Sequence, residues 1–331
     1  MRRAILCLLV LALPGGGGAA ALAAFTATTT NPGNSFSAAA TFSGMRVATG
    51  FYTGNGGDNR NIPGVNFQAD LVIVKGNNAQ SAVARSSSVG GDLSKPLAGA
   101  AGVASNLIQA IGATTFQVGS NAAVNASGVR YDWVAFRNYA GHMTEGLYTG
   151  NGGTQSITGL GFSPDYVLVA GAGNTAAVQR SSSMSAAFRY DETAAAANGI
   201  TALGGDGFSV GDSAETNQSG QTYAYVAWNE IPGLMEEGSY AGTGGDDSDI
   251  SASLQPDYVM VRSSTNGNVC DRGVQRPSSL PGDNAQHFTN VANTGSNVIQ
   301  ALQATGFQVG SDCKVNTNGN PYYWVAFRNG G

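Results

Sequence analysis

Three copies of an aromatic segment are the residues of this sequence best suited to bind a ligand. The copies read YDWVAFRN from Tyr131, YAYVAWNE from Tyr223 and YYWVAFRN from Tyr322. Alternate residues of a strand project from one face, so each copy would present two aromatic rings together, and such rings can stack on sugars. An Asn upstream of each copy would supply a polar rim. The candidate ligand contacts are Tyr131, Trp133, Tyr223, Tyr225, Tyr322 and Trp324 with Asn125, Asn217 and Asn316; alternatively, these residues pack against neighbouring strands or repeats.

The sequence offers little support for catalysis. Its two histidines, His142 and His287, stand at positions that do not repeat, whereas His-based catalysis needs positioned partners. The serine runs at residues 86–88 and 181–183 lack the G-x-S-x-G elbow of a nucleophile, and one repeated Asp per unit does not provide the two carboxylates of a glycosidase. We therefore predict a protein that is not an enzyme and needs no cofactor. A secreted hydrolase is the least favoured alternative, with the loop around His287 as its only candidate site.

One Asp and one Arg recur upstream of every copy of the aromatic segment. The Asp directly precedes an apolar segment, and the Arg lies in the segment that follows. Opposite charges on adjacent strands help to set their register and add little stability. We predict structural ion pairs between Asp70 and Arg85, between Asp165 and Arg180, and between Asp257 and Arg276.

A cluster of acidic residues is present once and is not repeated. GGDDSD at residues 244–249 places three carboxylates together, which suits calcium, but the matching segments of the other copies read GGDNRN and GGTQSI. A solvated loop is the favoured interpretation, and no metal is predicted.

The elements that position these residues come from an internal repeat. Three units span residues 50–138, 146–230 and 238–329, and they begin with GFYTGNGGD, GLYTGNGGT and GSYAGTGGD. Each unit consists of short segments rich in β-branched and aromatic residues and separated by Gly, Asn and Pro, which is typical of all-β sandwiches. We predict an all-β fold of three tandem antiparallel β-sandwich, jelly-roll-like repeats. The connections YAGHMTE and IPGLMEE are too short to let the units move independently.

The glycine phrase that opens each unit fits a turn better than a phosphate site. A phosphate loop would lead into a helix, and a Walker-type loop would carry Gly-Lys-Ser/Thr; neither pattern follows the phrase. Glycine also permits a positive φ or a close backbone approach. We therefore expect a structural corner.

Two strands of each unit are apolar on both faces. In the closing strand of the first unit we assign Val134 and Phe136 to the core, whereas Tyr131 and Trp133 occupy the opposite face. A lone sandwich would leave one such face polar. The second face therefore needs a partner, which is a neighbouring repeat, another chain or a ligand.

Residues 1–23 have the pattern of a Sec-type signal peptide, with MRR, the apolar AILCLLVLAL and the small-residue site ALA. Cys7 lies within the apolar part, so we do not expect it to carry a lipid. We expect cleavage near Ala24 and an extracellular protein, secreted or at the cell surface. The mature chain has no apolar run of the ~20 residues that a transmembrane span needs. Residues 24–49 are expected to form one or two strands.

Two cysteines, Cys270 and Cys313, remain after removal of the signal peptide. An exported chain meets an oxidising environment, so we predict a disulfide between them. Both lie in the third unit and have no cysteine counterpart in the other two, so the fold should not require the bridge. Two thiols without an adjacent His do not make a zinc site.

The order G-x-Y-x-G-N-G, G-F-x-P-D-Y-V-x-V, G-F-x-V-G and N-x-x-G-x-x-Y-x-x-V-A-F is similar to a repeat of phage tail and tail-fibre proteins. The second unit carries it best, and the likeness covers nearly all of residues 50–329. Those phage units commonly have a Trp near the place where Val72, Val167 and Val259 stand here. A more distant resemblance to the H-type lectins, small sandwiches that assemble as trimers and bind sugars, implies surface binding and a pseudo-threefold packing of the repeats. The start of the mature region resembles that of camelysin-like surface proteins over a short stretch.

Two functions are favoured over the hydrolase. The first is a non-catalytic surface protein, adhesin-like or lectin-like, that binds a glycan or cell-envelope component. The second is a structural subunit of a surface appendage or tail-like assembly, with neighbouring copies of itself as partners. Nucleic acid is not an expected partner, because the net charge is −5 and no basic patch is visible.

Overall fold

The computed structural model describes residues 45–193, 195–264, 269–292 and 295–331. The predicted signal peptide, and residues 24–44 of the segment that follows it, lie outside the described residues. Residues 46–49 of that segment belong to the first strand of repeat 1.

All three repeats contain the same eight strands and one short α-helix in the same order, and repeat 3 has a 3-10 helix in addition. Repeat 1 contains β1 (Arg46–Thr53), β2 (Arg60–Ile62), β3 (Leu71–Gly76), β4 (Val83–Ser86), β5 (Lys95–Pro96), β6 (Ile108–Ile111), β7 (Phe116–Val118), α1 (Ala122–Asn125) and β8 (Arg130–Arg137). Repeat 2 contains β9 (Met143–Thr149), β10 (Gln155–Thr158), β11 (Tyr166–Gly171), β12 (Val178–Ser181), β13 (Phe188–Arg189), β14 (Ile200–Gly204), β15 (Gly207–Val210), α2 (Ala214–Asn217) and β16 (Thr222–Trp228). Repeat 3 contains β17 (Met235–Ala241), β18 (Ser248–Ser251), β19 (Tyr258–Ser263), the 3-10 helix η1 (Val269–Asp271), β20 (Val274–Pro277), β21 (Gln286–His287), β22 (Ile299–Gln303), β23 (Gly306–Val309), α3 (Cys313–Asn316) and β24 (Pro321–Phe327).

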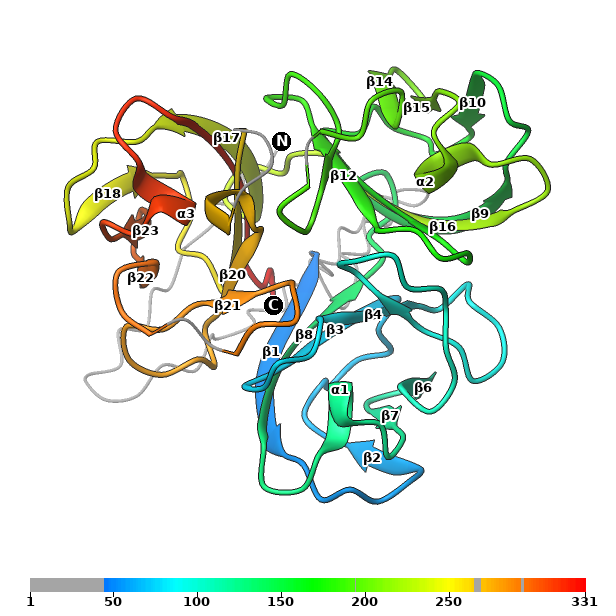
Figure 1. The fold of residues 1–331 in the computed structure, drawn as a ribbon, viewed down its shortest axis with the longest axis horizontal. Coiled ribbons are helices and arrows are strands. Elements are labelled where there is room, and N and C mark those ends of the chain that lie inside the picture. The colour runs from blue at the N-terminus through cyan, green and yellow to red at the C-terminus, as the bar shows by residue number, and fades with distance from the viewer. Residues whose placement is uncertain (1–44, 194, 265–268, 293–294) are drawn as a thin grey trace, which may run out of the picture. The chain divides into compact units, whose positions relative to one another are not determined.

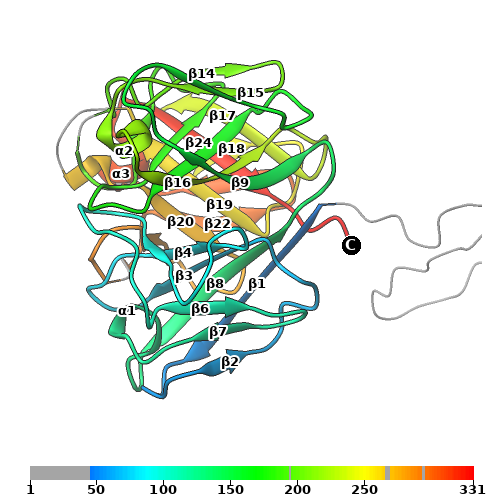
Figure 2. The ribbon, with the colours of Figure 1, turned by 90° about the vertical axis from the view of Figure 1, so that its right-hand side faces the viewer.

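Each repeat is a sandwich of a large and a small antiparallel sheet (Figures 1 and 2). The five-stranded sheets have the orders β1-β8-β3-β4-β5, β13-β12-β11-β16-β9 and β17-β24-β19-β20-β21. The three-stranded sheets have the orders β2-β7-β6, β10-β15-β14 and β18-β23-β22. The predicted all-β class, with three repeated β-sandwich units, is confirmed.

Both faces of the large sheet are buried, as the apolar pattern of its central strands requires. In β8, Tyr131 and Trp133 pack inside repeat 1 against residues of its small sheet such as Phe116. On the opposite face, Val134 and Phe136 join a core that all three repeats share. The face that we assigned to the core therefore lies between repeats, and the face that lacked a partner is covered by the small sheet of the same repeat.

The shared core places the last aromatic residue of each closing strand next to its two counterparts. The ring centroid of Phe136 lies 5.6 Å from that of Trp228 and 5.0 Å from that of Phe327, and the centroids of Trp228 and Phe327 are 5.6 Å apart. Each of these rings is at most 1% exposed. Because every ring contacts the other two, the three repeats surround one core rather than forming a linear array (Figure 1).

Backbone hydrogen bonds join the three repeats into a closed ring, and they run in the same direction at every contact between repeats. In each repeat, the carbonyl of the residue just after β5, or after its counterpart β13 or β21, accepts a hydrogen bond from the next repeat. The donor is the amide of the residue just before β12, β20 or β4, respectively. These bonds run from Ala177 N to Leu97 O (3.0 Å), from Gly273 N to Tyr190 O (3.1 Å) and from Ala82 N to Phe288 O (2.8 Å). The last of them joins repeat 1 to repeat 3, so residues 43–331 form one compact unit.

The predicted disulfide between Cys270 and Cys313 is confirmed, and it ties η1 to the first residue of α3. Its cysteines are 43 residues apart in the sequence. Reduction should lower the free energy of unfolding by about 2–4 kcal/mol, mainly because the unfolded chain gains entropy. Chemical denaturation with and without reductant measures the difference. The reduced protein should stay folded, because α1 and α2 adopt the same turn without a bridge; loss of structure on reduction would contradict this expectation.

Candidate functional site

The three predicted tyrosines of the closing strands are buried and brace the one-turn helices. The hydroxyl of Tyr131 donates to the carbonyl of Ala122 (2.7 Å) and accepts from the amide of Ala126 (2.8 Å), at the two ends of α1. Tyr223 and Tyr322 make the same pair of bonds around α2 and α3. The prediction that they contact a ligand is wrong, since all three are 0% exposed: Tyr131, Tyr223 and Tyr322.

The second aromatic residue of each closing strand lies over a glycine of the strand beside it. Trp133 pairs with Gly50, where an added Cβ would lie 2.4 Å from the indole ring. Tyr225 covers Gly146 and Trp324 covers Gly238 in the same way, and the nearest side-chain atom lies 2.8 Å from such a Cβ in both cases. Trp133 and Trp324 are buried and Tyr225 is half-buried. These rings fill the sandwich above the glycines, so they do not form the exposed aromatic face that the sequence suggested.

The three asparagines hold the glycine phrase in place and do not form a rim. The side chain of Asn125 accepts a bond from the amide of Asn55 (3.0 Å) and donates one to the carbonyl of Gly57 (2.6 Å). Between these contacts, Gly56 adopts a φ of 72°, a left-handed conformation that glycine allows at low cost. Asn217 and Asn316 make matching contacts with their own glycine phrases. At no more than 1% exposed, Asn125, Asn217 and Asn316 are structural residues.

The predicted ion pairs do not form. Asp70 accepts a bond from the amide of Asn138 (2.7 Å), and it lies opposite Ser87, whose amide donates to its carbonyl. Arg85 instead donates to backbone carbonyls of the following loop, including that of Gly91 (2.7 Å). The register of β3 and β4 places the loop carbonyls, rather than the carboxylate, at the end of the arginine. In the other repeats Asp165 and Asp257 also accept backbone amides, and Arg180 and Arg276 also donate to carbonyls.

At two of the three contacts between repeats, a carboxylate of the next repeat accepts hydrogen bonds from a pair of serines. Glu145 of β9 accepts from the hydroxyl of Ser87 (2.9 Å) and the amide of Ser88 (3.2 Å) in repeat 1. Glu237 of β17 accepts in the same way from Ser182 (2.5 Å) and Ser183 (3.2 Å) of repeat 2. Both glutamates directly precede the glycine that opens the glycine phrase.

The third contact replaces the carboxylate with a hydroxyl. Thr49 precedes Gly50 in repeat 1, and its Oγ1 lies 2.7 Å from the Oγ of Ser278 in repeat 3. Beside Ser278 the surface is hollowed into an open cleft of about 560 Å³. Its walls combine polar side chains with a small apolar area, and they include Gln255, Pro256, Asp257, Ser278, Leu302 and Arg328. This cleft is the candidate binding site of the described part of the chain.

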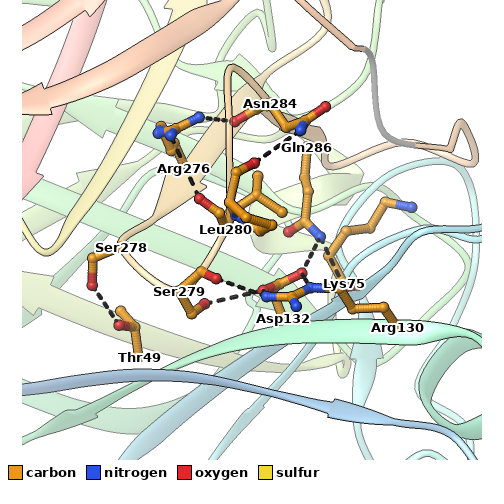
Figure 3. A network of polar contacts seen from close by, with 11 residues as sticks. Thr49, Lys75, Arg130, Asp132, Arg276, Ser278, Ser279, Leu280, Asn284 and Gln286 are labelled. Carbon is orange, nitrogen blue, oxygen red and sulfur yellow. Dashed lines mark hydrogen bonds and ion pairs between the residues drawn. The ribbon is translucent and has the colours of Figure 1, made fainter.

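A buried polar network lies next to this cleft, where repeat 1 meets repeat 3 (Figure 3). Asp132 is 1% exposed and accepts from Arg130 through two nitrogens, at 2.7 and 3.1 Å. It also accepts from the Ser279 hydroxyl (3.1 Å) and the Gln286 amide (3.3 Å) of repeat 3. The fully buried ammonium of Lys75, whose pKa burial lowers to about 7, donates to nearby carbonyls. The network joins the two ends of the chain of repeats.

The other two contacts have different side chains at the position of Asp132. This position directly precedes the aromatic residue that lies over a glycine, which is Trp133 in repeat 1. Repeat 3 has Tyr323 there, and its ring lies 5.7 Å from that of Phe188 of repeat 2. Repeat 2 has Ala224, which leaves an apolar groove of about 250 Å³ beside Leu147 and repeat 1. Each contact between repeats is therefore recognisable by its own side chains, which favours one order of repeats around the ring.

His287 gives the fold a sensitivity to acid. It is 2% exposed, and burial, with the charges of Lys314 and Arg272 nearby, lowers its pKa from 6.5 to about 3. The unfolded chain binds a proton near pH 6.5 and the folded chain does not, so stability falls as the pH drops from 6.5 towards 3. Between pH 7 and pH 5 we expect this histidine to cost about 2 kcal/mol of unfolding free energy.

Denaturation at pH 7 and pH 5 measures this loss. The variant His287→Gln should lose much less stability over that interval, whereas His142→Gln, which changes the other histidine of the chain, should keep the pH dependence. Equal losses in the wild-type protein and in His287→Gln would refute the assignment.

Sequence reasoning missed the cleft because none of its residues forms a chemical motif. A usable signal was present in the repeat itself. The residue before the opening glycine is Glu in the second and third units and Thr in the first. A difference at one position of an otherwise regular repeat marks the contact that differs.

A comparison with models of protein families finds one match to part of the chain. A family model described as a domain of unknown function, DUF7483, matches residues 138–234. The match begins after β8 and ends one residue before β17, so it spans repeat 2 and the connections on either side. No curated protein matches the chain. Among the described residues, no helix is long and apolar enough to cross a membrane.

Proposed function

We propose that the protein is an exported, non-catalytic binding protein whose ligand is a glycan or another component of a cell envelope. The observation that carries this proposal is the open cleft of about 560 Å³ on repeat 3. It offers donors and acceptors from Gln255, Asp257, Ser278 and Arg328 beside the apolar Leu302. A sugar presents hydroxyl groups together with an apolar ring face, and such a mixed lining suits both.

The shared core makes the proposed site rigid. The cleft lies on strands and loops of a closed ring whose backbone hydrogen bonds hold every repeat to its neighbours. A site that is already ordered loses little conformational entropy when a ligand binds. The resemblance to the H-type lectins and the predicted signal peptide agree with a surface-binding role.

A structural subunit of an appendage or tail-like assembly is the second candidate. Phe51 is 58% exposed and Leu147 is 48% exposed at matching positions of β1 and β9. Exposed apolar side chains on a weakly charged surface can pack against other copies. The resemblance to phage tail repeats supports this alternative.

Binding of the purified protein to a panel of glycans and cell-envelope fractions, together with its mass in solution, tests the two candidates. Saturable binding by a monomer that weakens in Arg328→Ala, with unchanged thermal unfolding, would support the binding function. No binding, together with ordered oligomers that Phe51→Ser and Leu147→Ser dissociate, would favour the structural function. Leu147→Ser matches the residue of repeat 3, which has Ser239 at this position.

A further inference from the structure

The serines equivalent to Ser278 in repeats 1 and 2 show which chemical group binds at this position. Thr49, Glu145 and Glu237 are equivalent, because each precedes the glycine that lies under the aromatic ring of the closing strand. Each contacts the serine that follows the fourth strand of the preceding repeat in the ring. In repeats 1 and 2 the group placed on the serines is a carboxylate, and a neighbouring backbone amide completes its binding.

Repeat 3 has the same serine pair without the carboxylate. Ser278 and Ser279 correspond to Ser87 and Ser88. Within the residues that the structure describes, Ser278 Oγ contacts only the hydroxyl of Thr49, and the Ser279 amide has no carboxylate partner. Since Ser278 lines an open cleft here and Ser279 follows it in the chain, a carboxylate from outside the chain can occupy the place that Glu145 takes in repeat 1.

The charge around the cleft suits an anion despite the net charge of the chain. The exposed Arg328 contributes a guanidinium to its wall, and the neighbouring Arg276 adds a second positive charge. Asp257 is also present, but its counterpart in repeat 1 shows that a second carboxylate is tolerated. There, the Ser87 hydroxyl lies 3.3 Å from Asp70 and 2.9 Å from Glu145.

The remaining lining favours a sugar over an acidic peptide. The cleft is much larger than one carboxylate, and Gln255 and Asp257 offer acceptors to hydroxyl groups. A uronic acid residue carries hydroxyl groups that can donate to Asp257, whereas the side chain of an acidic peptide residue offers only a carboxylate, which Asp257 would repel. Leu302 and Pro256 supply an apolar surface for the ring.

We propose that the cleft on repeat 3 is a carboxylate-binding site that takes a uronic acid residue of an acidic polysaccharide. The sugar carboxylate accepts from Ser278 and the Ser279 amide and pairs with Arg328. This inference rests on the proposed glycan-binding function and names its ligand class.

Titration of the full-length protein with oligogalacturonate and with its methyl ester tests the site. The two probes have the same sugar chain, and only the acid offers a carboxylate. We expect the acid to bind at least about tenfold more tightly, because charged hydrogen bonds are lost in the ester. The variant Thr49→Glu should weaken binding of the acid by a similar factor, because it places the chain's own carboxylate on the serine pair as in the other repeats.

Matched changes at one position of two repeats provide the control. Arg328→Gln should also weaken binding of the acid about tenfold, whereas Arg137→Gln, at the equivalent position of repeat 1, should not change it. Thermal unfolding of each variant reports whether it is folded.

The outcomes separate this inference from the function on which it rests. Equal binding of acid and ester, or unchanged binding in folded Thr49→Glu, would overturn the carboxylate site and leave glycan binding standing. Poly-glutamate that binds as tightly as oligogalacturonate would overturn the assignment to a sugar. Binding of no glycan at all would overturn the proposed function and this inference together.

Discussion

Trp228→Ala should lower the free energy of unfolding by about 3–5 kcal/mol, which is typical for removal of a large buried aromatic side chain. Trp228 is 1% exposed, and its ring contacts Phe136 of repeat 1, Phe327 of repeat 3 and Tyr166 of its own repeat. The cavity would therefore open where all three repeats meet. Calorimetry or chemical denaturation of the purified variant measures the loss.

The chain supplies a matched control for this variant, because repeats 1 and 3 have Phe at the equivalent position. Trp228→Phe should cost less than about 1.5 kcal/mol, since it keeps an aromatic ring and removes an indole N–H that has no hydrogen-bond partner among the described residues. Unfolding of wild type and variants should remain a single transition. Separate transitions for the repeats, or a loss below 1 kcal/mol in Trp228→Ala, would contradict a core shared by the whole ring.

Asp132→Ala should lower the free energy of unfolding by about 3–5 kcal/mol, because it leaves a charged partner and buried donors without their acceptor. Asp132 binds Arg130 of its own repeat and both Ser279 and Gln286 of repeat 3 (Figure 3). Its loss removes polar contacts that join the first repeat to the last. Denaturation of the variant gives the magnitude, and protection of amides along β20 and β21 from hydrogen exchange shows where the fold loosens.

Two comparisons identify the origin of that cost. Repeat 2 already has Ala224 at the equivalent position, so a small residue is compatible with the strand itself. Adding Arg130→Ala to Asp132→Ala should recover part of the loss, since the unpaired charge is then removed. If the double variant is less stable by the sum of the two single effects, the two residues are not coupled and our description of the network is wrong.

The three interfaces between repeats have the same backbone hydrogen bonds but different side chains. Asp132, Ala224 and Tyr323 occupy the same position of the closing strand but meet a polar network, an open apolar groove and an aromatic contact, respectively. The backbone bonds that close the ring depend on no side chain and recur at every contact. The backbone therefore provides the ring, and the side chains distinguish its three contacts.

Local patterns determined the fold class and the disulfide. Short β-branched segments between Gly, Asn and Pro turns predict sandwich strands because strand formation depends on near neighbours and on alternation. With Cys7 assigned to the predicted signal peptide, Cys270 and Cys313 had only each other as a partner. The same patterns showed that both faces of β3 and β8 are apolar, and hence that both need to be covered.

Only the tertiary structure decided what covers each face and which residues meet across the ring. Alternation separates Tyr131 and Trp133 from Val134 and Phe136, but it cannot state that the small sheet covers the first pair and neighbouring repeats the second. The ion pairs failed for a similar reason, because the loop carbonyls that bind Arg85 are placed by the path of the chain.

The contact of Thr49 with Ser278 joins residues 229 positions apart. It depends on closure of the ring, which is a property of three sandwiches packed on one core and not of any single repeat. The sequence by itself therefore determined the repeat and its strands, whereas the hydroxyl contact of Thr49 with a serine whose counterparts meet a carboxylate exists only because the first repeat packs against the last.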